Sequence, residues 1–83
     1  MVSERKIRLR LKGVVGAALN DLELAAKTKV FAVFPMPEDQ SAWCINFSSG
    51  YGQVCIAITP HTTDEVIKVQ IMNHLESRSS IVN

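Results

Sequence analysis

Two cysteines and two histidines are the side chains of this sequence best suited to chemistry. Cys44 and Cys55 could act as nucleophiles, and a neutral His61 imidazole could act as a general base. However, both cysteines fall in the middle of expected strands, while His61 lies at a strand end, so the nucleophile and the base would not meet. With His74, these residues still lack the closely spaced ligand pairs of a structural zinc site. The sequence therefore predicts no catalytic residue, no metal site and no cofactor.

Phosphate binding and carboxylate catalysis have equally little support. Gly50-Tyr51-Gly52 is typical of a turn and lacks the adjacent lysine–serine or lysine–threonine pair of a phosphate-binding loop. Asp64 and Glu65 open an expected helix, where acids stabilise the helix dipole without any catalytic role. We therefore expect a protein that is not an enzyme.

Cations are concentrated at the N-terminal end. Residues 1–12 carry five cations and one acid, a net charge of +4, while the rest carries four cations and seven acids, a net charge of −3. Within the basic end, cations and aliphatic residues alternate, which predicts a strand over residues 7–12. Such a strand would point four cations to one side, and we predict these as the binding residues: Lys6, Arg8, Arg10 and Lys12.

Three interpretations of this basic strand remain open. It can be an edge strand that charge protects against aggregation. It can bind an acidic protein surface, or it can follow the phosphates of a nucleic acid. An aromatic platform for single-stranded nucleic acid is not expected, because Trp43 and Phe47 point to the core in the expected register.

The other elements follow from periodicity and turn residues. Helices are expected from Val14 to about Lys27 and from a Thr62–Glu65 capping box to about Ser77. Strands are expected over Lys29–Phe34, Ala42–Ser48 and Gln53–Thr59, the last two joined as a hairpin. Residues 1–5 and 78–83 are expected to be flexible.

A tight type II′ turn would set the register of that hairpin. It would place Ile45 opposite Ile56, and Cys44 opposite Ala57. The two cysteines would then be diagonal neighbours, and a disulfide between Cys44 and Cys55 would strain the sheet. We therefore expect free thiols.

Together these elements predict an α+β fold of two layers in the order β-α-β-β-β-α. Both helices would pack on one face of a mostly antiparallel four-stranded sheet. The other face would be flat and nearly uncharged, formed by Cys44, Asn46, Ser48, Cys55, Ala57 and Thr59. Because the second strand is apolar on both faces, a homodimer through this open face is the hypothesis that follows.

Length and composition place the protein in a broad class. Eighty-three residues with 47% hydrophobic content fit one small globular domain spanning residues 1–83. The longest apolar run, Val30–Phe34, is far shorter than the roughly 20 residues of a membrane span. We expect a cytoplasmic protein with no membrane contact, and two cysteines fit that compartment.

The sequence thus predicts a non-catalytic binding or regulatory domain that engages another protein. The contact would be the basic strand, the open sheet face, or both, and the domain would act as a monomer or a homodimer. The alternative is nucleic-acid binding through the same strand. The α-β-β-β-α part has the element order of double-stranded-RNA-binding domains, but its last helix begins with acids where theirs is lysine-rich.

Overall fold

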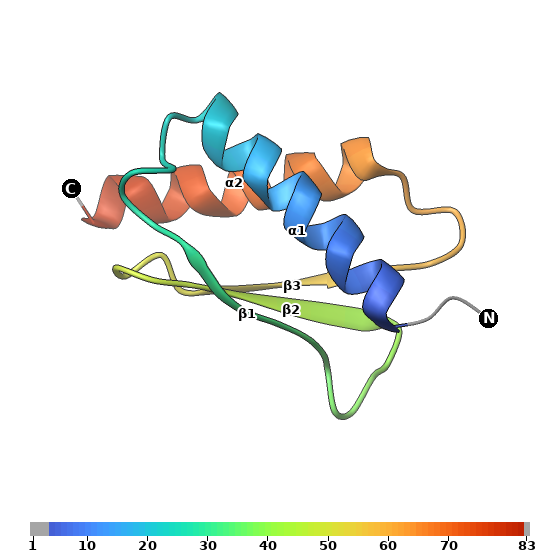
Figure 1. Ribbon diagram of the computed structural model, residues 1–83. Helices are drawn as coiled ribbons and strands as arrows, with labels where there is room; N and C mark the ends of the chain where they lie inside the picture. The colour runs from blue at the N-terminus through green and yellow to red at the C-terminus, as the bar shows by residue number, and fades with distance from the viewer. Residues whose placement is uncertain (1–3, 83) are drawn as a thin grey trace.

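Two helices and a three-stranded antiparallel sheet make up the fold. The computed structural model describes the backbone of residues 4–82 and the side chains of residues 4–79. In chain order the elements are α1 (Glu4–Asp21), β1 (Val30–Pro35), β2 (Ala42–Phe47), β3 (Gln53–Ala57) and α2 (Asp64–Val82). The sheet order is β1-β2-β3, so β2 is central and β1 and β3 are edges. Figure 1 shows both helices on the same side of the sheet.

The N-terminal basic segment is helical, so the expected strand over residues 7–12 is wrong. Its alternation is part of a longer helical stripe formed by Ile7, Leu11, Val14, Val15, Ala18 and Leu19. Arginine, lysine and leucine are also strong helix formers, which favours continuing this helix toward the N-terminus. As a result Leu11 is fully buried, whereas Leu9 is 61% exposed.

The end of α1 is set by a Schellman motif rather than by the expected run to Lys27. The amide of Leu24 donates to the Leu19 carbonyl at 2.8 Å, and the amide of Glu23 donates to Asn20 at 3.1 Å. Glu23 takes the left-handed conformation with φ 58°, and Leu24 is buried beneath the turn. The chain therefore leaves α1 directed toward β1.

The hairpin between β2 and β3 is shifted by two residues from the expected register. Ile45 lies opposite Val54, and Cys44 lies opposite Cys55. Positive φ angles at Ser49, Gly50 and Gly52 make a longer loop than the expected type II′ turn. Because an even shift keeps every side chain on its face, the division between core and open face is as expected.

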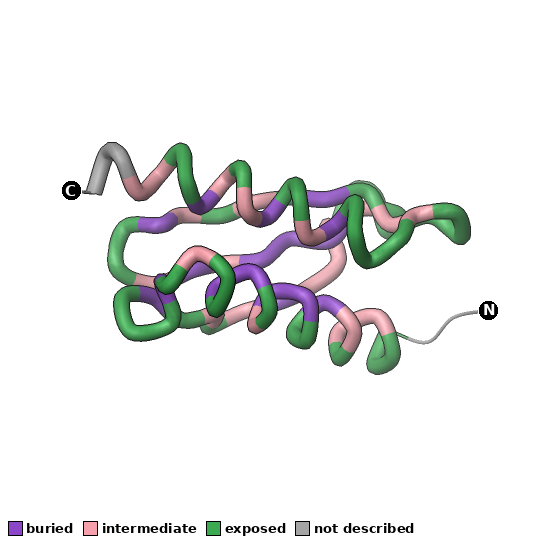
Figure 2. The backbone as a smooth tube through the Cα atoms, turned by 90° about the horizontal axis from the view of Figure 1, so that it is seen from above, coloured by how far each residue is buried: buried purple, intermediate pink, exposed green. Residues whose placement is uncertain are grey.

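The core lies between the helices and the sheet. Figure 2 shows buried positions along the inner sides of both helices and along the central strand. Completely buried residues come from every layer, including Leu11, Ile45, Ile67, Ile71 and Leu75. Tyr51, expected to be a turn residue, turns inward and is 1% exposed. Its carbonyl accepts a hydrogen bond from His74 Nε2 at 2.8 Å, which ties the hairpin loop to α2.

Helix α2 begins one residue later than the expected capping box. The hydroxyl of Thr63 accepts a hydrogen bond from the amide of Val66 at 3.2 Å, so Thr63 is the N-cap. Thr62 instead closes the preceding turn, where its hydroxyl accepts from the amide of Thr59 at 2.9 Å. The helical backbone continues beyond Ser77 to Val82. Neither helix in the described part of the chain is long and apolar enough to cross a membrane.

Two glycines should respond in opposite directions to alanine. At Gly13, inside α1, no atom other than those of the neighbouring residues and the helix's own backbone lies within 4 Å of the Cβ position. Gly13→Ala should therefore raise the free energy of unfolding by about 0.5–1 kcal/mol. At Gly52, φ is +74° and a Cβ would stand 3.3 Å from Arg78 Nη2. Gly52→Ala should therefore lower the free energy of unfolding by about 1–2 kcal/mol. Urea denaturation checks both signs, and a destabilised Gly13→Ala would contradict the open position of this residue.

Candidate functional site

Helix α1 separates the four predicted binding residues onto two sides. Residues two apart on a helix point in nearly opposite directions, while residues four apart share a side. Lys6 and Arg10 therefore lie on one side of α1, and Arg8 and Lys12 lie on the other. The single line of four cations expected from a strand is not formed.

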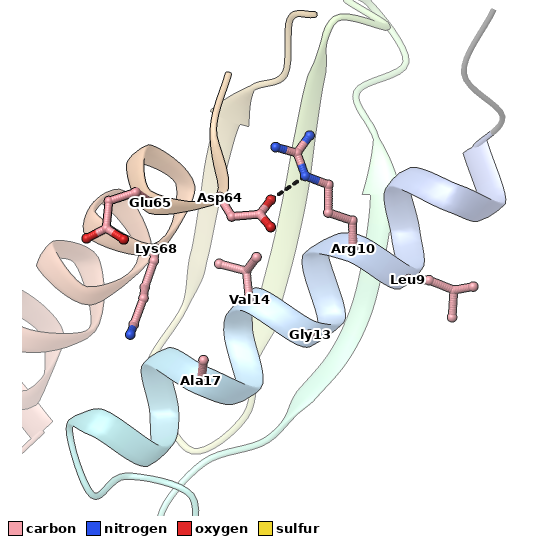
Figure 3. Close-up of a pocket in the computed structure, with 8 residues that line it drawn as sticks. All are labelled: Leu9, Arg10, Gly13, Val14, Ala17, Asp64, Glu65 and Lys68. Atoms are coloured by element: carbon pink, nitrogen blue, oxygen red, sulfur yellow. Dashed lines mark hydrogen bonds and ion pairs between the residues drawn. The ribbon is translucent and has the colours of Figure 1, made fainter. Parts of the chain in front are cut away.

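Arg10 faces α2 across a groove between the two helices. Its Nε forms an ion pair with Asp64, and its Nη2 donates to the Thr62 carbonyl at 2.7 Å. Figure 3 shows this pair across the groove, which has a volume of about 360 Å³. Both side chains are partly exposed, so the ion pair is worth about 0–1 kcal/mol. Arg10 thus mainly positions the start of α2.

A second ion pair joins the same two helices further along. Lys68 of α2 pairs with Asp21 at the end of α1. The hydrogen bond to Asp21 is the largest cause that raises the pKa of Lys68, ahead of the attraction of that carboxylate. The α1–α2 groove is therefore bounded by paired charges of both signs, which gives it no net preference for an acidic or a basic partner.

Arg8 lies on the opposite side of α1, against the edge strand β1. Its Nε donates to the Val33 carbonyl at 3.1 Å, and its guanidinium lies 5.6 Å from the centroid of the Trp43 ring. A stacked guanidinium of this kind contributes a cation–π attraction. Lys12 and the 70% exposed Phe31 line the same shallow groove. The side chains of both Arg8 and Arg10 are therefore engaged within the domain.

The free edge of β1 is poorly suited to pairing with another strand. The amide of Met36 donates to the Ala42 carbonyl at the start of β2. Along an antiparallel strand, every second residue directs its amide and carbonyl toward the partner strand. The main-chain groups of Val33 and Pro35 therefore point away from β2. The Val33 carbonyl is already occupied by Arg8, and Pro35 has no amide proton. The register also shifts between Val30 and Ala32. Charge, proline and a bulge are the devices by which natural edge strands avoid pairing.

The free edge of β3 carries none of these devices. The amide of Phe47 donates to the Gly52 carbonyl at 2.8 Å, and the amide of Ile58 donates to the Ser41 carbonyl at 2.6 Å. These two bonds show which residues of β3 direct their main-chain groups toward β2 and which direct them outward. The amides and carbonyls of Gln53, Cys55 and Ala57 therefore point away from β2. These three residues are exposed, uncharged and regular in backbone. The β3 edge is thus a bare template for another strand.

The open face of the sheet is continuous with this edge. Cys44, Cys55 and Ala57 lie on the face opposite Trp43 and Ile56, which are 1% exposed beneath the helices. In Figure 1 no described element covers that face. Its strand positions carry no charged residue, since the others on this face are Ala32, Phe34, Ala42, Asn46 and Gln53.

Cys44 and Cys55 lie side by side on the open face. They are directly opposite residues of β2 and β3, and their Sγ atoms are 2.7 Å apart. Both thiols are free, as expected, although the diagonal arrangement that led to this expectation is wrong. Cys44 is 2% exposed, and burial raises its pKa to about 11, with further contributions from the hydrogen bond and charge of Cys55. Cys55 is the thiol that reaches solvent.

The histidines do not join the cysteines. His74 is bonded to the Tyr51 carbonyl and stacks on Phe47 with ring centroids 6.0 Å apart. His61 is exposed in the loop before α2. Over the described residues, no three side chains among histidine, cysteine, aspartate and glutamate gather as metal ligands would.

This geometry defines a small α+β domain whose least protected surface is a strand edge. No protein-family model, curated protein or solved structure matches this chain. Sequence reasoning identified the uncharged open face but missed the β3 edge, because it placed an additional strand in the sheet. The absence of charge and proline from residues 53–57 is the signal that could have identified this edge.

Proposed function

We propose that this protein is a non-catalytic binding domain that acts as a homodimer, with β3 of one copy paired to β3 of a second copy. Strand addition at a sheet edge is an established mode of protein recognition, because main-chain hydrogen bonds form along the new pair. The observation that carries the proposal is the contrast between the two edges. The β1 edge is blocked by Arg8 and Pro35, whereas the β3 edge is bare.

An antiparallel β3–β3 pair has the symmetry of a dimer. With the two-fold axis at Cys55, the outward amide and carbonyl of this residue pair with those of its copy. Gln53 then lies directly opposite Ala57 of the second copy. The paired β3 residues include no charged side chain. Two three-stranded sheets become one six-stranded sheet. A second copy therefore supplies hydrogen-bond partners for the outward amides and carbonyls of β3 without any change in the strand's conformation.

Helix α2 supplies apolar surface above the same edge. Figure 1 and Figure 2 both show α2 running along β3, and the two elements are in contact. Val66 and Val69 of α2 are each 48% exposed. In a β3-paired dimer the two α2 helices approach one another, which offers these side chains partial burial. Burying apolar area contributes about 25 cal/mol per Å² and supports pairing of a short strand.

Charge substitution on β3 tests this pairing. Gln53→Lys/Ala57→Lys places lysines opposite each other twice across the two-fold axis. Each cross-strand charge pair changes stability by roughly 0.2–1 kcal/mol, so the dimer Kd should rise by roughly two- to thirtyfold. Sedimentation equilibrium over a concentration series measures this Kd.

Two variants serve as matched controls. Gln53→Lys/Ala57→Glu changes the same positions but pairs opposite charges across the axis, and it should keep or strengthen the dimer. Phe31→Lys adds a lysine to the other edge and should leave the Kd unchanged. Equal weakening by all three variants, or a wild-type protein that stays monomeric at high micromolar concentration, would refute the proposal.

Nucleic-acid binding remains the second candidate, because α1 presents the exposed cations Arg5, Lys6 and Lys12. Each phosphate contact on duplex DNA adds about −0.9 to the slope of log affinity against log salt concentration. Titration of labelled duplex DNA and RNA at several salt concentrations distinguishes the candidates. A slope of −2 or steeper, lost in Lys6→Glu/Lys12→Glu, would favour the nucleic-acid function, with −2 representing roughly two contacts.

A further inference from the structure

We propose that Cys44 and Cys55 are a redox-active pair that closes to a reversible cross-strand disulfide in exchange with a low-molecular-weight disulfide such as oxidised glutathione. The proposal goes beyond the binding function and does not depend on it. It adds a modification site on the open face of the sheet, with a small disulfide as the reacting partner.

The position of the two residues in the sheet carries this proposal. Hydrogen-bonded and non-hydrogen-bonded residue pairs alternate along an antiparallel pair of strands. Since the pairs Phe47–Gly52 and Ser41–Ile58 are hydrogen-bonded, Cys44 and Cys55 form a non-hydrogen-bonded pair. The Cα atoms of such pairs lie about 4.5 Å apart, which is within the range of about 4.4–6.8 Å that disulfides require. The Sγ atoms, 2.7 Å apart, already face each other. Closure therefore needs no movement of either strand.

The two thiols differ in the way that exchange chemistry requires. Cys55 is exposed and can be reached by an external disulfide, while Cys44 is 2% exposed and cannot. The raised pKa of Cys44, about 11, keeps its proton in place while Cys55 is the first to react. Gln53 Nε2 donates a hydrogen bond to Cys55 Sγ at 3.3 Å. Cys55 is thus the attacking residue and Cys44 the resolving residue.

The reaction balances in two exchange steps. The Cys55 thiolate attacks one sulfur of the small disulfide, forms a mixed disulfide, and releases one small thiol. The sulfur of Cys44 then attacks Cys55 Sγ, forms the intramolecular disulfide, and releases the second small thiol, which takes the Cys44 proton. Two protein thiols are oxidised and one small disulfide is reduced. Excess reduced thiol reverses both steps.

Mass spectrometry of the intact protein tests each step. After incubation with oxidised glutathione, the wild-type protein should lose the mass of two hydrogen atoms and both alkylatable thiols, and dithiothreitol should restore them. Cys44→Ser lacks the resolving thiol and should stop with one glutathione attached. Cys55→Ser keeps only the buried thiol and should stay unmodified while folded.

The controls separate this inference from the dimer proposal. Wild-type protein diluted far below the dimer Kd, where it is monomeric, should form the same intramolecular disulfide, so loss of the dimer leaves the test intact. A wild-type protein that keeps one glutathione like Cys44→Ser would overturn the proposal. So would a protein that remains fully reduced, or one whose disulfide joins two chains on a non-reducing gel.

Discussion

Leu11→Ala should destabilise the domain strongly. Leu11 lies in the centre of the α1 stripe and is fully buried, so truncation removes apolar contacts and leaves a cavity. Leucine-to-alanine changes of this kind lower the free energy of unfolding by about 2–5 kcal/mol. A domain of this size has a small stability margin, so the loss is a large part of the total. Urea denaturation followed by circular dichroism measures it.

Leu9→Ala provides the matched control, because it distinguishes a helix from a strand. In a strand, Leu9 and Leu11 would share a buried face and their truncations would cost similar amounts. In α1, Leu9 is 61% exposed, so Leu9→Ala should change the free energy of unfolding by no more than about 0.5 kcal/mol. Equal losses at the two positions would contradict the helical N-terminal segment.

Tyr51→Ala should have a comparable effect although it alters a loop residue. The side chain is 1% exposed within the core cluster, and large aromatic truncations cost about 3–5 kcal/mol. The loop would also lose the packing that holds its carbonyl against His74. Thermal unfolding should show the change as a marked fall in Tm.

Tyr51→Phe keeps the ring and serves as the control for this position. Its stability should lie within about 1 kcal/mol of wild type, since the buried apolar area is nearly conserved. If Tyr51→Ala lowered Tm only slightly, Tyr51 would not be a core residue. The connection would then be the two-residue type II′ turn expected from the sequence rather than the longer loop.

The sequence predicted the elements with unambiguous local signals. Prolines end β1, glycines separate β2 from β3, and hydroxyl and acidic residues open α2. The three strands therefore lie close to their expected ranges, and α2 begins close to its expected start. Residues 7–12 were misassigned because a short alternating segment also fits the beginning of a helix. Only the longer stripe, which includes Val15 and Ala18, resolves this ambiguity in favour of α1.

The candidate site was predicted less well, because it depends on long-range placement. Whether Arg8 and Arg10 share a side depends on the type of element that carries them. The contact between Cys44 and Cys55 depends on a register shift of two residues, and that shift depends on Tyr51 entering the core. Local propensities do not determine such a loop conformation, since core packing selects it.

Basic residues have a smaller role in this interpretation than their number implies. Arg10 joins α1 to the start of α2, and Arg8 covers an edge carbonyl and an aromatic ring. Protection of an edge by charge was one of the interpretations that the sequence left open, and Arg8 performs it from a helix. By occupying the β1 edge, Arg8 leaves β3 as the edge available for pairing.

Mixing two oppositely charged variants tests the β3-paired dimer most directly. Gln53→Lys/Ala57→Lys and Gln53→Glu/Ala57→Glu should each self-associate weakly, since like charges oppose one another across the axis. An equimolar mixture brings lysine opposite glutamate twice. With one variant labelled with heavy nitrogen so that the species separate by mass, native mass spectrometry should show more mixed dimer than the two homodimers combined, at about twice the 9.2 kDa chain mass. Random pairing would make the mixed dimer only equal to that combined amount. A mixture that shows no such preference, while the wild-type protein dimerises, would contradict pairing through β3.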